Sequence, residues 1–374
     1  MSDATTAMSP SKDWVNILFL TLTPVVGVVG TAVWTWYAGF SWWMPALLLV
    51  MYSLVGLSIT AGYHRYFSHR AYGAHPLVEL FYAFFGAMAA QNSILWWSSS
   101  HRVHHSYADK DWDPYNIQRG FWWAHILWIF HRNPAAGNFG NATDLVENRI
   151  VQWQHRWHKV ILIVGGFGIP TLIGAAFGNA IAGLLWGGFA RIVLIHHTTF
   201  FVNSLAHTWG KKAYSFEQSA RDNWVVALLT LGEGYHSFHH RFPADFRNGI
   251  HWFQWDPSKW FIRGLQSIGL AKGLRSTPAP LIEKARMDAA IRLLADHVEK
   301  ASATSYGEEI SRRIASARAA LERALELWRL QRDGKVVSMR RARLWRKIAR
   351  RHVRTARREW RAAVKLLRRI PEAA

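Results

Sequence analysis

Long apolar segments constrain the fold of this chain more than any other feature. Residues 14–37 form a charge-free one, and a helix needs about 20 such residues to cross the hydrocarbon core of a bilayer. A second segment, 41–63, follows after only three residues, and a further pair occupies 159–178 and 180–202, joined at Asn179. The sequence therefore predicts four transmembrane helices in two hairpins.

Two shorter apolar segments lie between these hairpins. Residues 76–97 carry Glu79, Gln91 and Asn92, and residues 121–130 are too short to span a bilayer. We interpret both as buried or interfacial helices. An even number of crossings puts both termini and the longer connecting segments on one side of the membrane.

That side carries most of the Lys and Arg, which favours the cytoplasm for it. The predicted fold class is an all-α integral membrane protein with four transmembrane helices in two hairpins, capped by a cytoplasmic helical domain. We expect the inner (cytoplasmic) membrane as its location, with both termini on the cytoplasmic side.

Positive charge is distributed unevenly along the chain. The 374 residues hold 45 Lys and Arg against 24 Asp and Glu, a net charge of +21. Residues 271–374 hold 27 basic and 11 acidic residues, so +16 of this charge lies there and only +5 in residues 1–270. We predict three parts: a short cytoplasmic N-terminus at 1–13, a membrane domain at 14–270 and a basic helical extension at 271–374.

The extension shows the periodicity of two amphipathic helices. Apolar residues recur at three- and four-residue steps in each half, namely Ile310, Ile314, Ala317, Leu321, Leu325 and Trp328, and then Val353, Ala356, Trp360, Val364 and Leu367. Because an apolar stripe of this period needs a packing partner, we predict an antiparallel helical hairpin with its turn at Asp333 and Gly334.

The second half of this hairpin is strongly basic. It holds 15 Lys and Arg between residues 335 and 369, with Glu359 as its one acidic residue. Near a cytoplasmic leaflet such a segment attracts anionic lipid at roughly 1 kcal/mol per charge, and it could also steer an acidic partner protein. Nucleic acid is not expected as a partner of a protein held at a membrane.

Nineteen histidines and no cysteines limit the possible chemistry. Disulfides, iron–sulfur clusters and thiolate nucleophiles are excluded, so a bound metal must use His, carboxylate or backbone ligands. Three clusters each follow an apolar stretch: His64 and His69; His101, His104 and His105; His236, His239 and His240. In the second and third clusters the three- and four-residue steps place the rings on one face of a helix.

The first cluster has a different spacing. On an α-helix the step from His64 to His69 rotates the two rings by about 140°, so they could serve different metals. His207 follows the fourth apolar segment at a similar depth and is a ninth candidate ligand. The remaining histidines keep a structural interpretation because their spacing does not group them: His75, His125, His131, His155, His158, His196, His197, His251, His297 and His352.

Eight or nine imidazoles exceed the needs of one metal ion. Zinc sites take three or four protein ligands, so this number indicates two metals with mostly nitrogen ligands. A di-iron centre fits best. Two irons can share the electrons needed to activate dioxygen, and such a centre can attack an unactivated C–H bond.

The residues around the histidines resemble the membrane-bound fatty acyl desaturase family, in particular its stearoyl-CoA (delta-9) branch and the bacterial type. The matching stretches are 60–70 (TAGYHRYFSHR), 111–116 (DWDPYN), 232–240 (GEGYHSFHH) and 242–249 (FPADFRNG). The resemblance covers roughly residues 15 to 265. It implies that all nine histidines bind two irons, with Asn203 reaching one of them through water.

The resemblance also implies the reaction. Dioxygen and two electrons from an external donor would introduce a cis double bond into a saturated acyl chain, with acyl-CoA as the expected substrate and delta-9 as the expected position. No side chain beyond the metal ligands would be catalytic. The donor is expected to be a separate protein of the ferredoxin, rubredoxin or cytochrome b5 type with a reductase, because the sequence contains no haem-binding His-Pro-Gly-Gly segment.

The sequence departs from the family near the expected CoA headgroup. Ser99 and Ser100 stand where animal CoA-using members have Arg-Asp, and Gln118 precedes Arg119 where they have two arginines. Because lost charges weaken contacts to phosphates, an acyl-lipid or acyl-carrier substrate stays open. Trp97 matches a family tryptophan near the substrate channel, although it could equally be an interfacial anchor. The candidate phosphate partners are Arg102, Lys110 and Arg119.

Two other protein classes share part of this pattern. A related di-iron membrane enzyme, such as an alkane hydroxylase or a carotenoid oxygenase, has the same histidine clusters but yields an oxygenated product. A zinc transporter would place His and Asp within its crossings. Here the ionisable groups in the crossings are mainly Arg191, His196 and His197, which disfavours a transporter.

Overall fold

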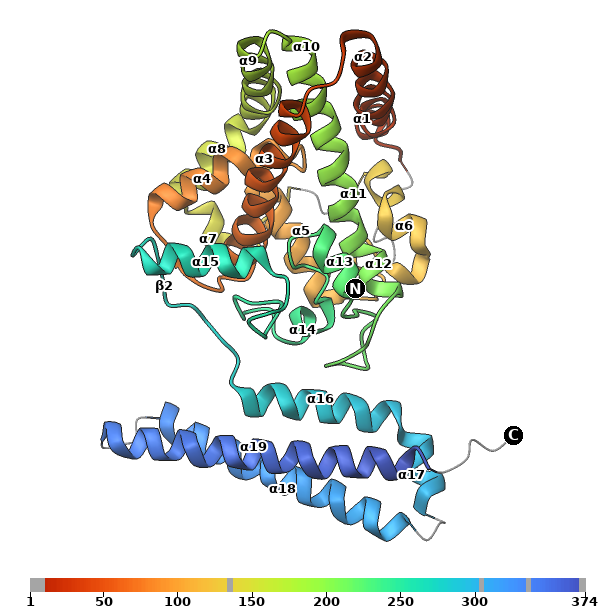
Figure 1. Cartoon of the computed structure of the whole chain (residues 1–374), viewed down its shortest axis with the longest axis vertical. Helices are drawn as coiled ribbons and strands as arrows, with labels where there is room; N and C mark the ends of the chain where they lie inside the picture. The colour runs from red at the N-terminus through yellow and green to blue at the C-terminus, as the bar shows by residue number, and fades with distance from the viewer. Residues whose placement is uncertain (1–10, 133–136, 303–305, 334–337, 370–374) are drawn as a thin grey trace, which may run out of the picture. The chain divides into compact units, whose positions relative to one another are not determined.

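A computed structural model describes residues 11–132, 137–302, 306–333 and 338–369 (Figure 1). The chain forms two compact units. The first comprises Met1–Lys211 and Gln218–Arg275, and the second comprises Lys212–Glu217 and Ser276–Ala374. The second unit thus begins close to the predicted start of the basic extension and also takes in a short segment from the middle of the chain.

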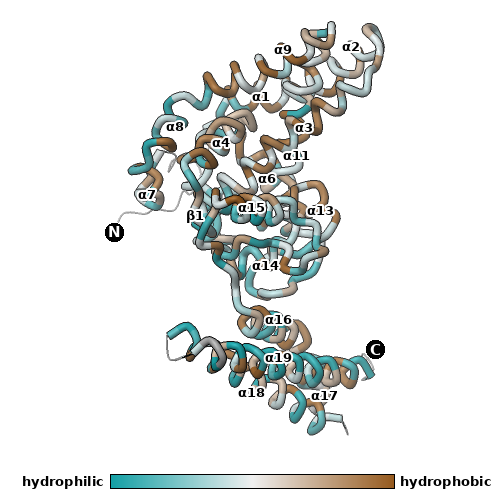
Figure 2. Tube along the Cα trace, turned by 60° about the vertical axis from the view of Figure 1, so that its left-hand side comes forward, coloured by the Kyte–Doolittle hydropathy of each residue, from teal (hydrophilic) through white to brown (hydrophobic). Residues whose placement is uncertain are grey.

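Four helices of the first unit are long and apolar enough to cross a membrane, as predicted: Trp14–Ala38, Trp43–Ser68, Arg149–Ala176 and Ala180–Thr208. Each contains a π-helical stretch. In chain order their parts are α1 (Trp14–Pro24), η1 (Val25–Gly30), α2 (Thr31–Ala38), α3 (Trp43–Leu57), η2 (Ser58–Ser68), α8 (Arg149–Ile161), η5 (Leu162–Gly168), α9 (Ile169–Ala176), α10 (Ala180–Gly183), η6 (Leu184–Ala190), α11 (Arg191–Asn203) and α12 (Leu205–Thr208). Figure 2 shows hydrophobic residues along most of α1, α3 and α9.

The second hairpin is held by close backbone packing and by one buried charge. A Cβ atom added to Gly183 would lie 2.2 Å from the carbonyl oxygen of Pro170, so only glycine allows α9 and α10 to approach this closely. Arg191 is fully buried and donates to the carbonyl oxygens of Gly187 and Gly166, both at 3.0 Å. A charge inside a span therefore has its donors satisfied by backbone.

A cap of short helices completes the first unit. It consists of β1 (Gly73–Ala74), α4 (Pro76–Ala87), α5 (Ile94–Tyr107), η3 (Ile117–Arg119), α6 (Phe121–His125), η4 (Leu127–Phe130), α7 (Thr143–Val146), α13 (Trp224–Leu229), α14 (His236–Arg241), α15 (Pro257–Ser267) and β2 (Ala271–Lys272). β1 pairs antiparallel with β2, Gly73 opposite Lys272, which is a small addition to the predicted all-α fold. The core of the unit packs around Tyr63, Tyr82 and Ile94, all fully buried.

The apolar segment 76–97 is two helices rather than one. The chain bends after α4 because Ala90 and Asn92 adopt positive φ angles of 55° and 75°, which a helix cannot continue through. The Oγ of Ser93 then accepts a hydrogen bond from the backbone N–H of Trp96 and caps α5. This bend lets α5 turn its histidines toward the end of the second span.

The second unit contains the predicted antiparallel hairpin. Its helices are α16 (Ala279–Leu293), α17 (Ala295–Ser302), α18 (Gly307–Arg332) and α19 (Met339–Leu367). Ala317 and Leu321 of α18 pack against Val353 and Ala356 of α19. The predicted turn begins at Asp333, which follows α18, while Gly334 lies outside the described residues.

Candidate metal centre

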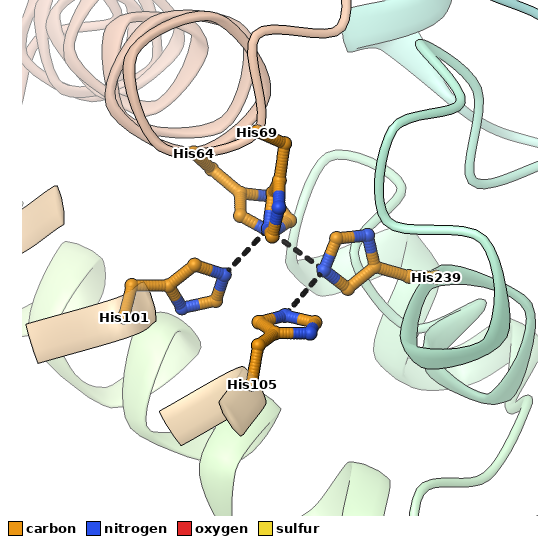
Figure 3. Close-up of side chains that lie close together, drawn as sticks. All are labelled: His64, His69, His101, His105 and His239. Atoms are coloured by element: carbon orange, nitrogen blue, oxygen red, sulfur yellow. Dashed lines mark hydrogen bonds between the residues drawn. The ribbon is translucent and has the colours of Figure 1, made fainter. Parts of the chain in front are cut away.

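The nine candidate histidines converge into two groups. The five-histidine group is His64, His69, His101, His105 and His239, and the four-histidine group is His104, His207, His236 and His240. Within each group one nitrogen of every ring lies within 4.8 Å of the others. Figure 3 shows the rings of the five-histidine group pointing toward a common centre from three separate segments of the chain. The fold therefore brings together all nine histidines that the sequence pattern singled out.

The π-helix η2 delivers two rings to the same group. The backbone N–H of His69 donates to the carbonyl oxygen of His64 at 3.2 Å, which is a five-residue hydrogen bond and not the four-residue bond of an α-helix. Residues five apart therefore lie above one another, and the two ring centroids are 4.9 Å apart. The expectation that these rings diverge, which assumed α-helical geometry, is wrong.

The helices α5 and α14 each serve both groups. α5 gives His101 and His105, four residues apart, to the five-histidine group and gives His104 to the other. α14 has the opposite arrangement: His236 and His240, four residues apart, belong to the four-histidine group, and His239 belongs to the five-histidine group. The groups are adjacent, since the rings of His105 and His240 stack with centroids 4.4 Å apart.

Two buried carboxylates and one partly buried hydroxyl fix the orientation of three rings through their Nδ1 atoms. His64 Nδ1 lies 2.7 Å from a carboxylate oxygen of Glu233, and His104 Nδ1 lies 2.8 Å from Asp113. His207 Nδ1 lies 2.6 Å from the hydroxyl of Ser219. A proton held on Nδ1 by such an acceptor leaves the Nε2 lone pair free to bind a metal.

Sequence reasoning gave none of these three supporting residues a role. Glu233 and Asp113 lie inside the motif stretches, but nothing in the spacing says which histidine each one reaches. Ser219 lies in a segment without any motif. The only signal that could have found the carboxylates is the general rule that a metal-bound histidine donates its second nitrogen to a carboxylate.

Glu233 is part of a buried charge network beneath the five-histidine group. Its carboxylate accepts hydrogen bonds from Arg65 Nη2 at 2.8 Å and from Asn248 Nδ2 at 2.7 Å, and Arg65 also pairs with Asp256 at 3.0 Å. Burial alone raises the pKa of Glu233, but His64 and Arg65 outweigh that effect and lower it to about 2. The carboxylate is therefore ionised and holds the His64 proton.

The protonation state of the histidines suits metal binding. Burial, followed by the proximity of the other rings, holds the pKa well below its usual range for His69, His101, His105, His236, His239 and His240. These imidazoles are therefore neutral at neutral pH and keep a lone pair for a metal.

The positions of the nitrogens also fit a bound cation. Nε2 atoms face one another at 2.9 Å between His64 and His239 and at 3.3 Å between His104 and His240. Since His64 and His104 hold their protons on Nδ1, their Nε2 lone pairs point into the groups. Within the described residues the Nδ1 atoms of His236, His239 and His240 have no hydrogen-bond partner. All-nitrogen donor sets of this kind suit iron, zinc, copper or nickel.

Comparison with known proteins agrees with this geometry. The profile of the fatty acid desaturase family matches residues 40–264, which contain all nine histidines. The chain belongs to the fatty acid desaturase family. This confirms the family that the histidine motifs indicated.

Individual desaturases are similar over most of the chain. Acyl-CoA desaturase 1 of Saccharomyces cerevisiae is 40% identical over 281 residues, which cover 73% of this chain and 54% of the yeast protein. The sn-2 palmitoyl-lipid 9-desaturase of Nostoc sp. is 35% identical over 276 residues, covering 72% and 93%. Stearoyl-CoA desaturase 5 of Homo sapiens is 36% identical over 240 residues, covering 62% and 72%. The chain spans about half the length of this yeast protein and of the probable acyl-CoA desaturase of Schizosaccharomyces pombe, 54% and 50%.

Two further residues that the sequence singled out, Trp97 and Asn203, differ in how they are placed near the histidines. The indole of Trp97 stacks on the ring of His101 with centroids 5.0 Å apart, and its Nε1 donates to Gln91 at 3.1 Å. Trp97 thus packs against the five-histidine group, and its contact with a substrate stays a prediction. Asn203 is the last residue of α11, four residues before His207, and is partly buried. Its contact with a metal through water stays a prediction.

The three candidate phosphate partners differ in whether their charged groups are exposed or bonded within the fold. Arg102 donates to Asp144 at 2.7 Å and to the carbonyl oxygens of Phe67 and Ser68, so its guanidinium is used inside the fold. These bonds give Arg102 a packing role, and its phosphate contact stays a prediction. Lys110 and Arg119 are exposed, and the Arg119 guanidinium lies 3.4 Å from the ring centroid of Trp123. Their phosphate contacts stay predictions.

Proposed function

We propose that this chain is an oxygen-dependent desaturase that introduces a cis double bond, at delta-9, into a saturated acyl chain carried as acyl-CoA. The observation that carries the proposal is the pair of buried histidine groups at the ends of membrane-spanning helices, in a chain of the fatty acid desaturase family. The relatives named above are an acyl-CoA, an acyl-lipid and a stearoyl-CoA desaturase. We place the activity in residues 14–270 and regard 271–374 as an accessory extension.

Two irons are the proposed occupants, one for each histidine group, with Asn203 contributing through water. When bound, such a pair supplies the activation of dioxygen with two electrons from a separate donor protein of the ferredoxin, rubredoxin or cytochrome b5 type. The side chains have positioning roles. Glu233 and Asp113 hold the Nδ1 protons of His64 and His104, so that the Nε2 atoms keep their lone pairs and their direction.

Burial contributes by keeping water away from the reacting carbon atoms. Five of the nine histidines are at most 4% exposed, namely His64, His104, His207, His236 and His239. The indole of Trp97 covers His101 on one side. A dry site of this kind favours removal of hydrogen from an apolar chain over side reactions with water.

An acyl-lipid is the second candidate substrate, and one observation favours it. Arg102 is used inside the fold, and serines stand at positions 99 and 100 where animal CoA-using members carry Arg-Asp. A CoA headgroup would therefore find fewer free cations here. Relatives from cyanobacteria are named as acyl-lipid desaturases, which is consistent with a bacterial type of enzyme.

The histidine groups are proposed to face the cytoplasm. The segment between the two pairs of spans and the segment after the fourth span together carry most of the Lys and Arg of the first unit, and such segments stay on the cytoplasmic side. Both termini would then lie on that side too, in the inner membrane.

Fatty-acid analysis by gas chromatography tests the activity directly. The intact chain is expressed in a host that lacks the product, beside a His104→Ala control. We expect a new cis-monoene that is absent from the control, with its double bond located by mass spectrometry. An alcohol in place of the alkene would assign the chain to the hydroxylases.

A second assay separates the two substrates. Membranes that contain the enzyme receive either labelled stearoyl-CoA or the same label already esterified in phospholipid, with acyl transfer between the pools blocked. Label appearing in the monoene only from the phospholipid pool would replace acyl-CoA by acyl-lipid as the substrate.

A further inference from the structure

A row of cations that lack an acidic partner among the described residues runs along one side of α19. Its members line a single shallow hollow and are all exposed: Arg343, Arg346, Lys347, Arg350, Arg351 and Arg354. We call these six residues the α19 basic row. Among the described residues none of the six has an ion-pair partner, and in Figure 2 much of α19 is hydrophilic.

Cations on the packed surfaces of the same unit are paired with acidic residues. Arg357 lies 2.5 Å from Glu283, and Arg313 lies 2.9 Å from Glu359. The unit therefore uses acidic residues to neutralise cations on its packed surfaces, and it leaves the α19 basic row without them. Like charges at four-residue steps, as in Arg343 and Lys347, destabilise a helix, so the row does not serve the stability of the hairpin.

The row is rigid and points away from the core of the hairpin. Val353 and Ala356 of α19 are buried against α18, while the six members of the row are exposed, and this packing fixes the rotation of the helix about its axis. From Arg343 to Arg354 the row is about 16 Å long, at 1.5 Å per residue. Guanidinium groups in such a row can bind several phosphate oxygens at once, each with two hydrogen bonds.

We propose that the α19 basic row docks on anionic phospholipid headgroups of the bilayer in which the first unit is embedded. The chain runs from β2, which ends at Lys272, to α16, which begins at Ala279, so the second unit is covalently tethered to a membrane protein. The tether converts a weak surface interaction into an intramolecular one with a high effective concentration. A polyanion from solution lacks this advantage, and salt weakens its attraction.

A single fluorescent label can report this docking. The chain has no cysteine, and Leu344, next to the row, is 54% exposed, so Leu344→Cys gives one labelling site. The full chain is labelled with nitrobenzoxadiazole and placed in nanodiscs that contain a spin-labelled headgroup as quencher. We expect stronger quenching in discs of phosphatidylglycerol and phosphatidylcholine than in phosphatidylcholine alone, and a loss of the difference at ~1 M salt, where the screening length is about 3 Å.

Two matched triple variants decide whether the row itself is responsible. Arg343, Arg350 and Arg354 are replaced by Gln in one, and the exposed α18 residues Arg318, Arg323 and Arg329 in the other. At about fivefold per cation, the first set should lower the ratio of docked to free label by about 10²-fold. The second set should leave it within a few fold, and circular dichroism checks that both keep their helices.

Three outcomes would overturn the proposal. One is equal quenching in neutral and anionic discs, and another is an equal loss in both triple variants. The third is a signal in neutral discs that appears only when inorganic polyphosphate or an RNA duplex is added, which would assign the row to a soluble polyanion. Desaturase activity is not the readout, so the result is independent of the proposed function.

Discussion

The two histidine groups share helices but differ in what supports them. In the five-histidine group, His64 is held by Glu233, which Arg65 and Asn248 hold in turn, so the support is a buried network of charges. In the four-histidine group, His207 is held by a neutral hydroxyl, Ser219, whose own partner is Asp109 at 2.5 Å. The first support lies within the core of the unit and the second lies on a loop.

This difference indicates which of the two histidine groups is held more firmly. Arg65 is on the π-helix that carries His64 and ends just before His69, and it is 1% exposed. Asp109 has a positive φ of 64° and Ser219 follows an irregular segment, so both depend on loop conformation. We expect the four-histidine group to be the more easily perturbed of the two.

Removal of one ligand from each group should have the largest effect. His69→Ala in the five-histidine group and His207→Ala in the other should each lower activity by at least ~10²-fold, because a missing ligand costs more than a missing partner of a ligand. Iron content by mass spectrometry and monoene yield are the measurements, with the exposed His251→Ala as control. Full iron content and activity in His207→Ala would remove His207 from the ligand set.

Acidification of the metal-free protein should have the next largest effect. Burial holds the pKa of six rings below its ordinary value, so below about pH 7 the unfolded chain binds protons that the folded chain does not. These rings are His69, His101, His105, His236, His239 and His240. The free energy of unfolding therefore falls as pH falls, by about 1 kcal/mol per histidine between pH 7 and 5.5.

Thermal unfolding of the chelator-treated protein in detergent, followed by circular dichroism, measures this loss. Of these six rings, four belong to the five-histidine group and two to the four-histidine group. An unfolding midpoint that stays the same from pH 7 to 5.5 would contradict the burial of neutral imidazoles. The carboxylate of Glu233 adds its own loss only at lower pH, between about 4.5 and about 2.

Replacement of the two supporting carboxylates should separate the groups. Glu233→Gln and Asp113→Asn each remove the acceptor charge behind one ring, and we expect about 10- to 100-fold weaker metal binding in both. Glu233→Gln should also destabilise the fold, because Arg65 loses one of its two buried partners. Metal titration and thermal unfolding distinguish the two effects. Equal unfolding midpoints in the two variants would contradict the claim that Glu233, unlike Asp113, is part of a buried charge network that stabilises the fold.

The features that could be predicted from the sequence are those set by residues close together in the chain. The four spans follow from the length and hydropathy of continuous segments, and the ligand histidines follow from short spacings next to them. The assignment of rings to groups could not be predicted, because it depends on how α5 and α14 cross and on the five-residue bond between His69 and His64. Nothing in the local pattern of residues 58–68 distinguishes a π-helix from an α-helix.

The supporting residues depend on contacts between distant parts of the chain. Glu233 reaches His64 from 169 residues away, and Ser219 reaches His207 across a loop. Asp113 is closer, nine residues from His104, but its approach needs the turn that follows α5. Spacing rules act within one helix, so they identify ligands and leave the partners of the ligands unassigned.

The smallest predicted effect concerns the hydroxyl behind His207. Ser219→Ala removes one neutral hydrogen bond to the ring, and a bond of this kind is worth about 1 kcal/mol, or roughly fivefold in affinity. Metal should therefore be lost first from the four-histidine group during titration with a chelator, while the five-histidine group keeps its own. Ser219→Thr, which retains the hydroxyl, is the matched control and should release metal as the unmodified protein does. Simultaneous loss from both groups in Ser219→Ala would show that they bind metal as one unit, and it would remove the difference in support as an explanation of their behaviour.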